Sequence, residues 1–161
     1  MTSGESRANP AHPKRQFVCA YDYTDIHDRL VFQKVRYRTS DGRGKTFAYR
    51  RPDGHGHWLS GKPDDADGYL YRLPQLFEAT LRGSDIWWTE GEKDADSLVE
   101  HPNAGVVATS HHGGAGHVDL EQAKWFRGFA GRVFLVGDRD EPGAGDMRLR
   151  YRLLRHVGIA S

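Results

Sequence analysis

Three acidic residues stand at the ends of two short apolar segments of the chain. Glu90 ends the segment 86–90, and Asp138 ends the segment 132–138, with Asp140 two positions further on. Carboxylates that lie close together repel one another unless a cation joins them, and their hard oxygens suit Mg²⁺ or Mn²⁺. If the fold brings the two segments together, these residues predict a divalent-metal site built from distant parts of the sequence.

The segments around the acidic residues alternate between strand and helix patterns. Such an alternation is typical of an α/β fold with a parallel sheet, whose ligands bind outside the carboxyl ends of the strands. Glu90, Asp138 and Asp140 would then meet at one edge of the sheet. Asp119 followed by Gln122 is typical of a helix capping box. We expect strands at 86–90, 105–110 and 132–138, and helices at 91–100, 119–129 and 145–157.

The last of these helices has an amphipathic pattern. Its apolar face is expected to carry Leu149, Leu153 and Val157, and its basic face Arg148, Arg152 and Arg155. The basic face could contact a nucleic-acid backbone, and a solvated helix surface explains it as well. Residues 158–161 resemble the start of a fourth strand.

The first half of the chain combines short strands with many basic residues. We expect strands at 17–24, 30–37 and 45–51 and a short helix at 71–79. Between positions 29 and 51 there are eight Lys or Arg and a single acidic residue, Asp41. Arginines beside aromatic residues can hold phosphates and stack bases, although strand packing and a solvated face explain them too. The candidate nucleic-acid ligands are Arg36, Arg38, Arg50 and Arg51, interleaved with Tyr37, Phe47 and Tyr49.

The composition limits the classes of protein that the chain can belong to. It has 161 residues, 37% of them hydrophobic and 28% charged, with a net charge of +1, which is typical of a globular protein. The sequence has no apolar run of membrane-spanning length and no signal-peptide pattern, so we expect a cytoplasmic protein without a membrane partner. The single cysteine, Cys19, excludes an internal disulfide and a cysteine-based zinc ribbon.

Three motifs carry a resemblance to a known family. They are Thr-Glu-Gly-Glu-Lys-Asp-Ala at 89–95, Ser-His-His-Gly-Gly-Ala-Gly at 110–116 and Gly-Asp-Arg-Asp-Glu-Pro-Gly at 137–143. In this order and spacing they resemble a Toprim domain, which primases, topoisomerases and some nucleases share. The segments 21–25, 32–37, 50–54 and 70–76 resemble the part that precedes Toprim in primase-like proteins of phages, plasmids and mobile elements.

The resemblance implies a domain organisation and an activity. It implies a basic β-rich subdomain at 16–82 and a Rossmann-like Toprim domain at 83–161 that is incomplete at its C-terminus. The small, polar and proline-containing composition of residues 1–15 predicts a disordered tail before them. The implied activity is DNA primase-type nucleotidyl transfer, in which NTPs are joined into an RNA primer on a single-stranded DNA template. A replicative helicase is an implied partner. His117 stands where relatives often have Lys, and the zinc module usual upstream in relatives has no cysteine set here.

The resemblance also assigns roles to residues. Asp138 and Asp140 would hold Mg²⁺ or Mn²⁺, and Glu90 would complete the metal shell or act as general base. Lys93 would contact phosphate. The phosphate-binding candidates in the glycine-rich loop are Ser110, Gly113 and Gly114.

Simpler interpretations of the acids remain open, because Glu90 could complement a helix N-terminus and Asp138 could cap a loop. Two other functions also remain open: a Toprim-type Mg²⁺-dependent nuclease and a non-catalytic nucleic-acid-binding module.

Overall fold

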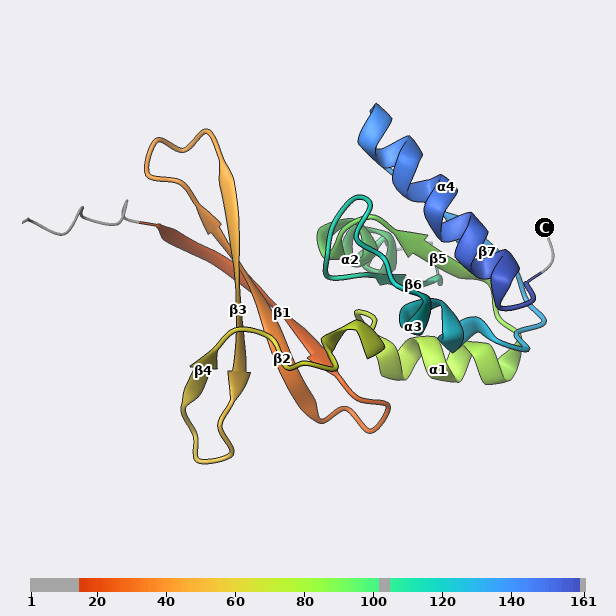
Figure 1. Ribbon diagram of the computed structural model, residues 1–161, viewed down its shortest axis with the longest axis horizontal. Helices are drawn as coiled ribbons and strands as arrows, with labels where there is room; N and C mark the ends of the chain where they lie inside the picture. The colour runs from red at the N-terminus through yellow and green to blue at the C-terminus, as the bar shows by residue number, and fades with distance from the viewer. Residues whose placement is uncertain (1–14, 102–104, 160–161) are drawn as a thin grey trace, which may run out of the picture.

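The computed structural model describes residues 15–101 and 105–159, which form two sheets at opposite ends of the molecule (Figure 1). The first is antiparallel with strand order β1-β2-β3-β4, and the second is parallel with order β6-β5-β7. The chain is therefore an α/β protein with a separate antiparallel sheet. In chain order the elements are β1 (Gln16–Thr24), β2 (Leu30–Arg38), β3 (Lys45–Pro52), β4 (Trp58–Ser60), α1 (Leu73–Arg82), β5 (Ile86–Thr89), α2 (Glu92–Glu100), β6 (Val107–Ser110), α3 (Leu120–Ala123), β7 (Val133–Leu135) and α4 (Glu141–His156).

The antiparallel sheet has one face turned toward the rest of the protein, here called the inner face and defined by Tyr23, Phe32, Lys34 and Tyr49. Register puts these residues together, because Tyr23 pairs with Phe32 and Lys34 pairs with Tyr49. Alternate residues of a strand point to the same side, and the Tyr23 and Phe32 rings stack with centroids 4.5 Å apart. The inner face is thus an aromatic surface with one lysine in it.

The parallel sheet is built around β5, which pairs in register with β6 on one side and β7 on the other. Ile86 and Trp88 of β5 are fully buried and share a hydrophobic core with residues of α1, α3 and α4. In Figure 1, α2 lies behind the sheet, on the face opposite α4. The three strands run in the same direction, so their carboxyl ends meet at one edge.

Several boundaries differ from those expected from the sequence. The helix expected at 119–129 is only one turn of α-helix, Leu120–Ala123, followed by the 3-10 turn Lys124–Phe126, although its capping box at Asp119 and Gln122 is present. Strand β4 was not expected. Gly158 and Ile159 form no strand, and the rest of the expected fourth strand lies outside the described residues, as does the expected tail up to position 14.

Helix α4 differs most from its prediction. It begins at Glu141, four residues before the expected start, because Asp140 caps it and Pro142 occupies its first turn. Its buried stripe consists of Gly143, Asp146, Arg150 and Leu154. The predicted apolar face is confirmed in part, because Val157 is buried and Leu153 packs against the core. The centre of the buried stripe is shifted around the helix, because Asp146 and Arg150 compensate each other's charge and can be buried together.

No helix within the described ranges combines the length and the apolar character needed to cross a membrane.

Candidate functional site

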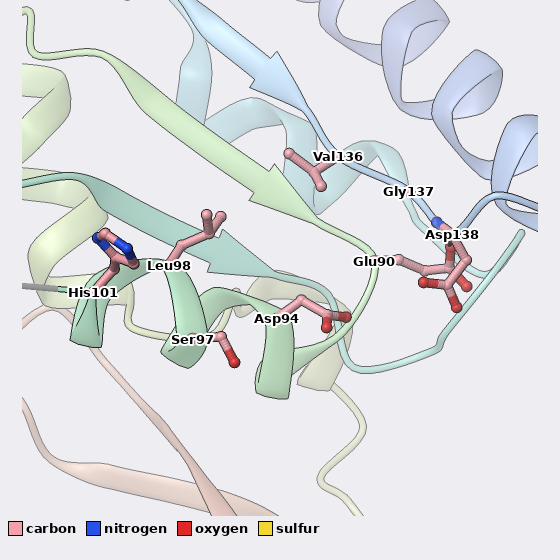
Figure 2. A pocket seen from close by; sticks show the side chains of 8 residues that line it. All are labelled: Glu90, Asp94, Ser97, Leu98, His101, Val136, Gly137 and Asp138. Carbon is pink, nitrogen blue, oxygen red and sulfur yellow. Dashed lines mark hydrogen bonds between the residues drawn. The ribbon is translucent and has the colours of Figure 1, made fainter. Parts of the chain in front are cut away.

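Glu90 and Asp138 meet at the carboxyl edge of the parallel sheet, where β5 and β7 end (Figure 2). The backbone N–H of Asp138 donates a hydrogen bond to Glu90 Oε2 at 3.1 Å. Glu90 is half-buried and Asp138 is exposed. Two of the three acidic residues predicted to meet at this edge are thus side by side, although 48 positions separate them in the sequence.

The third acid, Asp140, has a structural task in this conformation. Its Oδ1 accepts a hydrogen bond from the backbone N–H of Gly143 at 2.8 Å and so caps α4. Within residues 15–101 and 105–159, no three His, Cys, Asp or Glu side chains form a group that could hold a metal ion. Of the three predicted carboxylates, Glu90 and Asp138 therefore form a pair, and Asp140 caps the neighbouring helix.

The chemistry of the pair nevertheless fits Mg²⁺ or Mn²⁺. The hydrogen bond from Asp138 uses one oxygen of Glu90, and the other carboxylate oxygens of the pair make no hydrogen bond within the described part of the chain. Hard oxygen donors of this kind are the ligands that these cations prefer. Glu90 and Asp138 would hold the cation, and Asp140 lies two residues away on the same loop.

A cavity of about 480 Å³ opens beside the two acids, between α2 and the end of β7 (Figure 2). Its rim is acidic, with Glu90, Asp94 and Asp138, and the side chains of Leu98 and Val136 provide apolar wall. The cavity gives the two carboxylates open access from the α2 side of the sheet.

Gly143 allows the close approach of α4 to the two acids. A Cβ atom at this position would lie 2.5 Å from the backbone O and 2.9 Å from the backbone N of Asp138, both shorter than real Cβ contacts. Because the nearest atom is backbone, the neighbouring loop would have to move. Only glycine fits here without moving the loop that carries Asp138.

We expect Gly143→Ala to destabilise the protein by about 1–3 kcal/mol, the usual range for an overpacked site. The matched control is Gly145→Ala in the same helix. A Cβ there would meet only the end of Arg148, 3.8 Å away, so this variant should gain about 0.5–1 kcal/mol from helix propensity. Urea unfolding of both variants tests the prediction, and equal stabilities would contradict it.

The other predicted site residues lie around the same edge but differ in access. Lys93 is exposed in the first turn of α2, and Gly113 is exposed in the glycine-rich loop. Gly114 is half-buried with φ of +75°, a conformation that favours glycine. Ser110 is fully buried, so its hydroxyl is not available to a phosphate in this conformation.

The four arginines predicted to bind nucleic acid lie on both faces of the antiparallel sheet. Arg36 and Arg38 lie on the inner-face side of β2, and with Arg43 and Lys45 they line a hollow of about 500 Å³ at the far end of the sheet. Arg50, by contrast, pairs with Gln33 on the opposite face, so the four do not form one surface.

Arg50 and Arg51 are engaged by contacts within their own sheet. Arg50 Nε donates to Gln33 Oε1 at 2.6 Å, and its guanidinium carbon lies 4.1 Å from the centroid of the Trp58 ring. Arg51 Nη1 donates to the carbonyl of Ser60 at 3.1 Å. Arg38 is exposed, and Arg36 is half-buried with a hydrogen bond to the Tyr21 side chain. Because both line the hollow, they are the better candidates for binding a ligand.

A buried ion pair joins the antiparallel sheet to the helix that follows Glu90. Lys34 Nζ on the inner face lies 2.9 Å from Glu92 Oε1 in α2. The Tyr23 hydroxyl donates to the same oxygen at 2.7 Å, and its burial and the nearby charge of Glu92 raise the pKa of Tyr23 well above its usual value. All three side chains are buried, so Glu92 anchors the sheet and is not an open metal ligand.

His112, in the loop after β6, also contacts the antiparallel sheet. Its backbone carbonyl accepts a hydrogen bond from the Tyr49 hydroxyl at 2.8 Å, and its Nε2 lies 2.9 Å from Asp67 Oδ1. The imidazole is 2% exposed and packs edge-on against Phe32. Burial, and then the charge of Lys62, lowers the pKa of His112 from 6.5 to about 4.

This lowered pKa predicts that acid weakens the fold. Between pH 6.5 and about 4 the unfolded state binds a proton at His112 that the folded state does not, so stability falls as the pH decreases through this window. The full loss is roughly 3 kcal/mol at about 1.4 kcal/mol per pKa unit. Urea unfolding at pH 7 and at pH 4.5 measures this loss. Between the two pH values the free energy of unfolding should fall less for His112→Gln than for wild type.

The control is His55→Gln, at an exposed position, which should lose as much stability as wild type between the two pH values. If His112→Gln also loses as much as wild type, His112 is not the group responsible for the acid sensitivity.

The residues that sequence reasoning missed are mostly buried polar groups. Lys34 is two residues after Phe32 in β2, so both side chains point to the same face of the strand. This spacing is a weak sequence signal for a buried charge. Asp146 and Arg150 are spaced four apart on one helix, a spacing at which side chains meet. Nothing in the sequence identifies Glu92 as the partner of Lys34, because 58 residues separate them.

Comparison with known proteins gives a likeness of fold. No protein-family model and no curated protein sequence matches the chain. Among solved structures, the primase fragment of the bacteriophage T7 primase-helicase protein is 22% identical with a TM-score of 0.55, covering 88% of this chain and 50% of the other. The Aquifex aeolicus primase, with its zinc-binding and RNA polymerase domains, is 19% identical with a TM-score of 0.59, covering 87% and 32%.

A third similar structure comes from a larger assembly. It is a chain in the structure of the bacteriophage T7 lagging-strand DNA polymerase interacting with primase domains of two gp4 subunits bound to an RNA/DNA hybrid and dTTP. That chain is 21% identical with a TM-score of 0.54, covering 83% of this chain and 59% of that one. The protein therefore has a primase-like fold. It spans less than two thirds of the length of each of these three chains.

Proposed function

We propose that the protein is a metal-dependent DNA primase-type nucleotidyltransferase, with a Toprim domain at 83–161 and a basic β-rich subdomain at 16–82. The observation that carries the proposal is the meeting of Glu90 and Asp138 at the carboxyl edge of the parallel sheet, in a chain with a primase-like fold. The likeness to T7 primase domains bound to an RNA/DNA hybrid and dTTP supports a single-stranded DNA template and NTPs as ligands. The likeness to a primase-helicase supports a replicative helicase as partner.

Each residue of the proposed site has a chemical task. A divalent cation bound there would neutralise the charge that develops on phosphate oxygens during nucleotidyl transfer. Asp138 would hold that cation, and Glu90 would either complete the metal shell or accept the proton of an attacking hydroxyl as general base. Lys93 and the amide of Gly113 would contact phosphate, with no side chain at Gly113 to obstruct the approach.

The antiparallel sheet would hold the template on Arg36 and Arg38. Replacing both with Gln should lower the slope of log K against log[salt] for single-stranded DNA by about 1.4, because each lost phosphate contact on a single strand contributes roughly 0.7. The matched control is the Arg50→Gln/Arg51→Gln double variant, whose side chains are engaged within the sheet. A larger change in the control than in the Arg36/Arg38 variant would reverse the assignment.

Incorporation of labelled ribonucleotides on single-stranded DNA tests the proposed activity. The full chain is incubated with NTPs and either Mg²⁺ or Mn²⁺, and the products are resolved by length. Metal-dependent RNA products would support primase-type chemistry. Metal-dependent cleavage of the DNA would replace it with nuclease chemistry. Salt-sensitive DNA binding with neither product would indicate a non-catalytic binding module.

A further inference from the structure

Two charged side chains of α4 are completely buried beneath the candidate site. Asp146 and Arg150 are both 0% exposed, and Arg150 Nη2 lies 2.7 Å from Asp146 Oδ2. Removing two charges from water is costly, and apolar side chains of similar size often serve stability as well or better. Stability alone is therefore a poor explanation for a buried ion pair at this position.

Arg150 connects the two strands that carry the candidate acids. Its Nη1 donates a hydrogen bond to the carbonyl of Trp88 in β5, and its Nη2 donates to the carbonyl of Val136, just beyond β7, at 3.0 Å. Trp88 is two residues before Glu90, and Val136 is two residues before Asp138. One guanidinium thus spans the carboxyl ends of both strands.

Asp146 connects the same helix to the glycine-rich loop. Its Oδ1 accepts a hydrogen bond from the backbone N–H of Gly116 at 2.9 Å and lies 3.4 Å from Nε2 of the buried His111. That nitrogen is also 2.9 Å from the carbonyl of Gly114. A carbonyl only accepts, so Nε2 carries the proton. The loop is held to α4 at two points.

Asp146 is ionised in this network. Burial works against its charge, but the hydrogen bonds from His111 and from the Gly116 amide, together with the charge of Arg150, outweigh burial and lower the pKa of Asp146 below its usual value. The pair is therefore a buried salt bridge that also hydrogen-bonds to backbone atoms of three separate segments, at Trp88, Val136 and Gly116.

We propose that Asp146 and Arg150 are positioning residues that hold the strand end before Glu90, the strand end before Asp138 and the glycine-rich loop as one unit. As a statement about catalysis the proposal rests on the proposed function, since neither side chain touches the substrate. It makes α4 the element that sets the distance between the acids and the phosphate-binding loop.

Hydrogen–deuterium exchange and Mn²⁺ titration of the full chain test the proposal. In Asp146→Asn, exchange should become faster in the peptides covering 86–90, 111–117 and 133–138. The Kd for Mn²⁺ should rise about 10–100-fold, the usual effect of removing a residue that supports the metal ligands without touching the metal. Asp85→Asn is the matched control, because Asp85 pairs with Arg132 across the amino ends of the same two strands. Leu76→Ala, in the same core, controls for general destabilisation.

Each outcome decides the matter. Faster exchange in all three segments with weaker Mn²⁺ binding, in Asp146→Asn but in neither control, supports the proposal. Faster exchange with an unchanged Mn²⁺ Kd overturns it, as does exchange that remains at the wild-type rate. If wild type binds no Mn²⁺ but exchange becomes faster in all three segments of Asp146→Asn, the result supports the positioning role of Asp146 and Arg150 and contradicts the proposed metal chemistry. Should Asp146→Asn not fold, Arg150→Lys keeps the buried positive charge and gives the same comparison.

Discussion

Ribonucleotide incorporation is expected to fall by about 10²–10⁴-fold when Glu90 is replaced by Gln, the range typical of losing a general acid–base group. The substitution keeps the size of the side chain and an oxygen that can accept the hydrogen bond from the Asp138 amide. It removes the negative charge and the proton-accepting oxygen. Loss of activity in a folded protein would therefore report on the chemistry of the carboxylate.

Asp138→Asn should cause a loss of similar size, because Asp138 is exposed beside Glu90 and its carboxylate is not needed for a backbone contact. Mn²⁺ binding, followed by the enhancement of water proton relaxation, should weaken in both variants, and urea unfolding should show that their stability is close to wild type.

Asp140→Asn serves as the comparison. Asparagine retains the side-chain oxygen that caps α4, so stability should be preserved. Activity then shows whether the Asp140 charge takes part in metal binding. Full activity in Glu90→Gln would refute the proposed site, whatever the behaviour of Asp140→Asn.

The fold could be predicted largely because strand and helix patterns are local. The alternation along 86–138 indicated a parallel sheet, and parallel strands necessarily place Glu90 and Asp138 at the same edge. Asp140 shows where this reasoning stops. The sequence Asp-Glu-Pro-Gly fits both a metal loop and a helix start with Asp at the N-cap and Pro in the first turn. Only the geometry assigns the Asp140 carboxylate to the cap.

The four candidate arginines belong to one sheet but do not share one face, for a reason that the sequence contains. Arg50 and Arg51 are neighbours in a strand, so their side chains must point to opposite faces, and they cannot both join Arg36 and Arg38. The buried pair of Lys34 and Glu92 is a different case. It joins a strand of the antiparallel sheet to helix α2, and no local pattern specifies which charge meets which.

Lys34→Met is expected to destabilise the protein by about 3–5 kcal/mol, the usual result of removing one partner of a buried ion pair. Methionine fills similar space but leaves Glu92 buried and without a cation, although the Tyr23 hydroxyl still donates to it. The aromatic contact between Lys34 and Phe47, with Nζ 4.7 Å from the ring centroid, is also lost. Urea unfolding measures the change in the free energy of unfolding.

The double variant Lys34→Met/Glu92→Gln should recover most of that loss, because the uncompensated charge is gone and the glutamine oxygen can still accept the Tyr23 hydrogen bond. Lys62→Met is the matched control: it removes an ion pair with Asp67 whose side chains are 39% and 51% exposed, so it should change stability by less than about 1 kcal/mol. A Lys34→Met loss no larger than the control would mean that the aromatic inner face alone joins the two sheets. A double variant as unstable as Lys34→Met would mean that the lysine stem and its ring contact, and not the charge pair, hold the antiparallel sheet against α2.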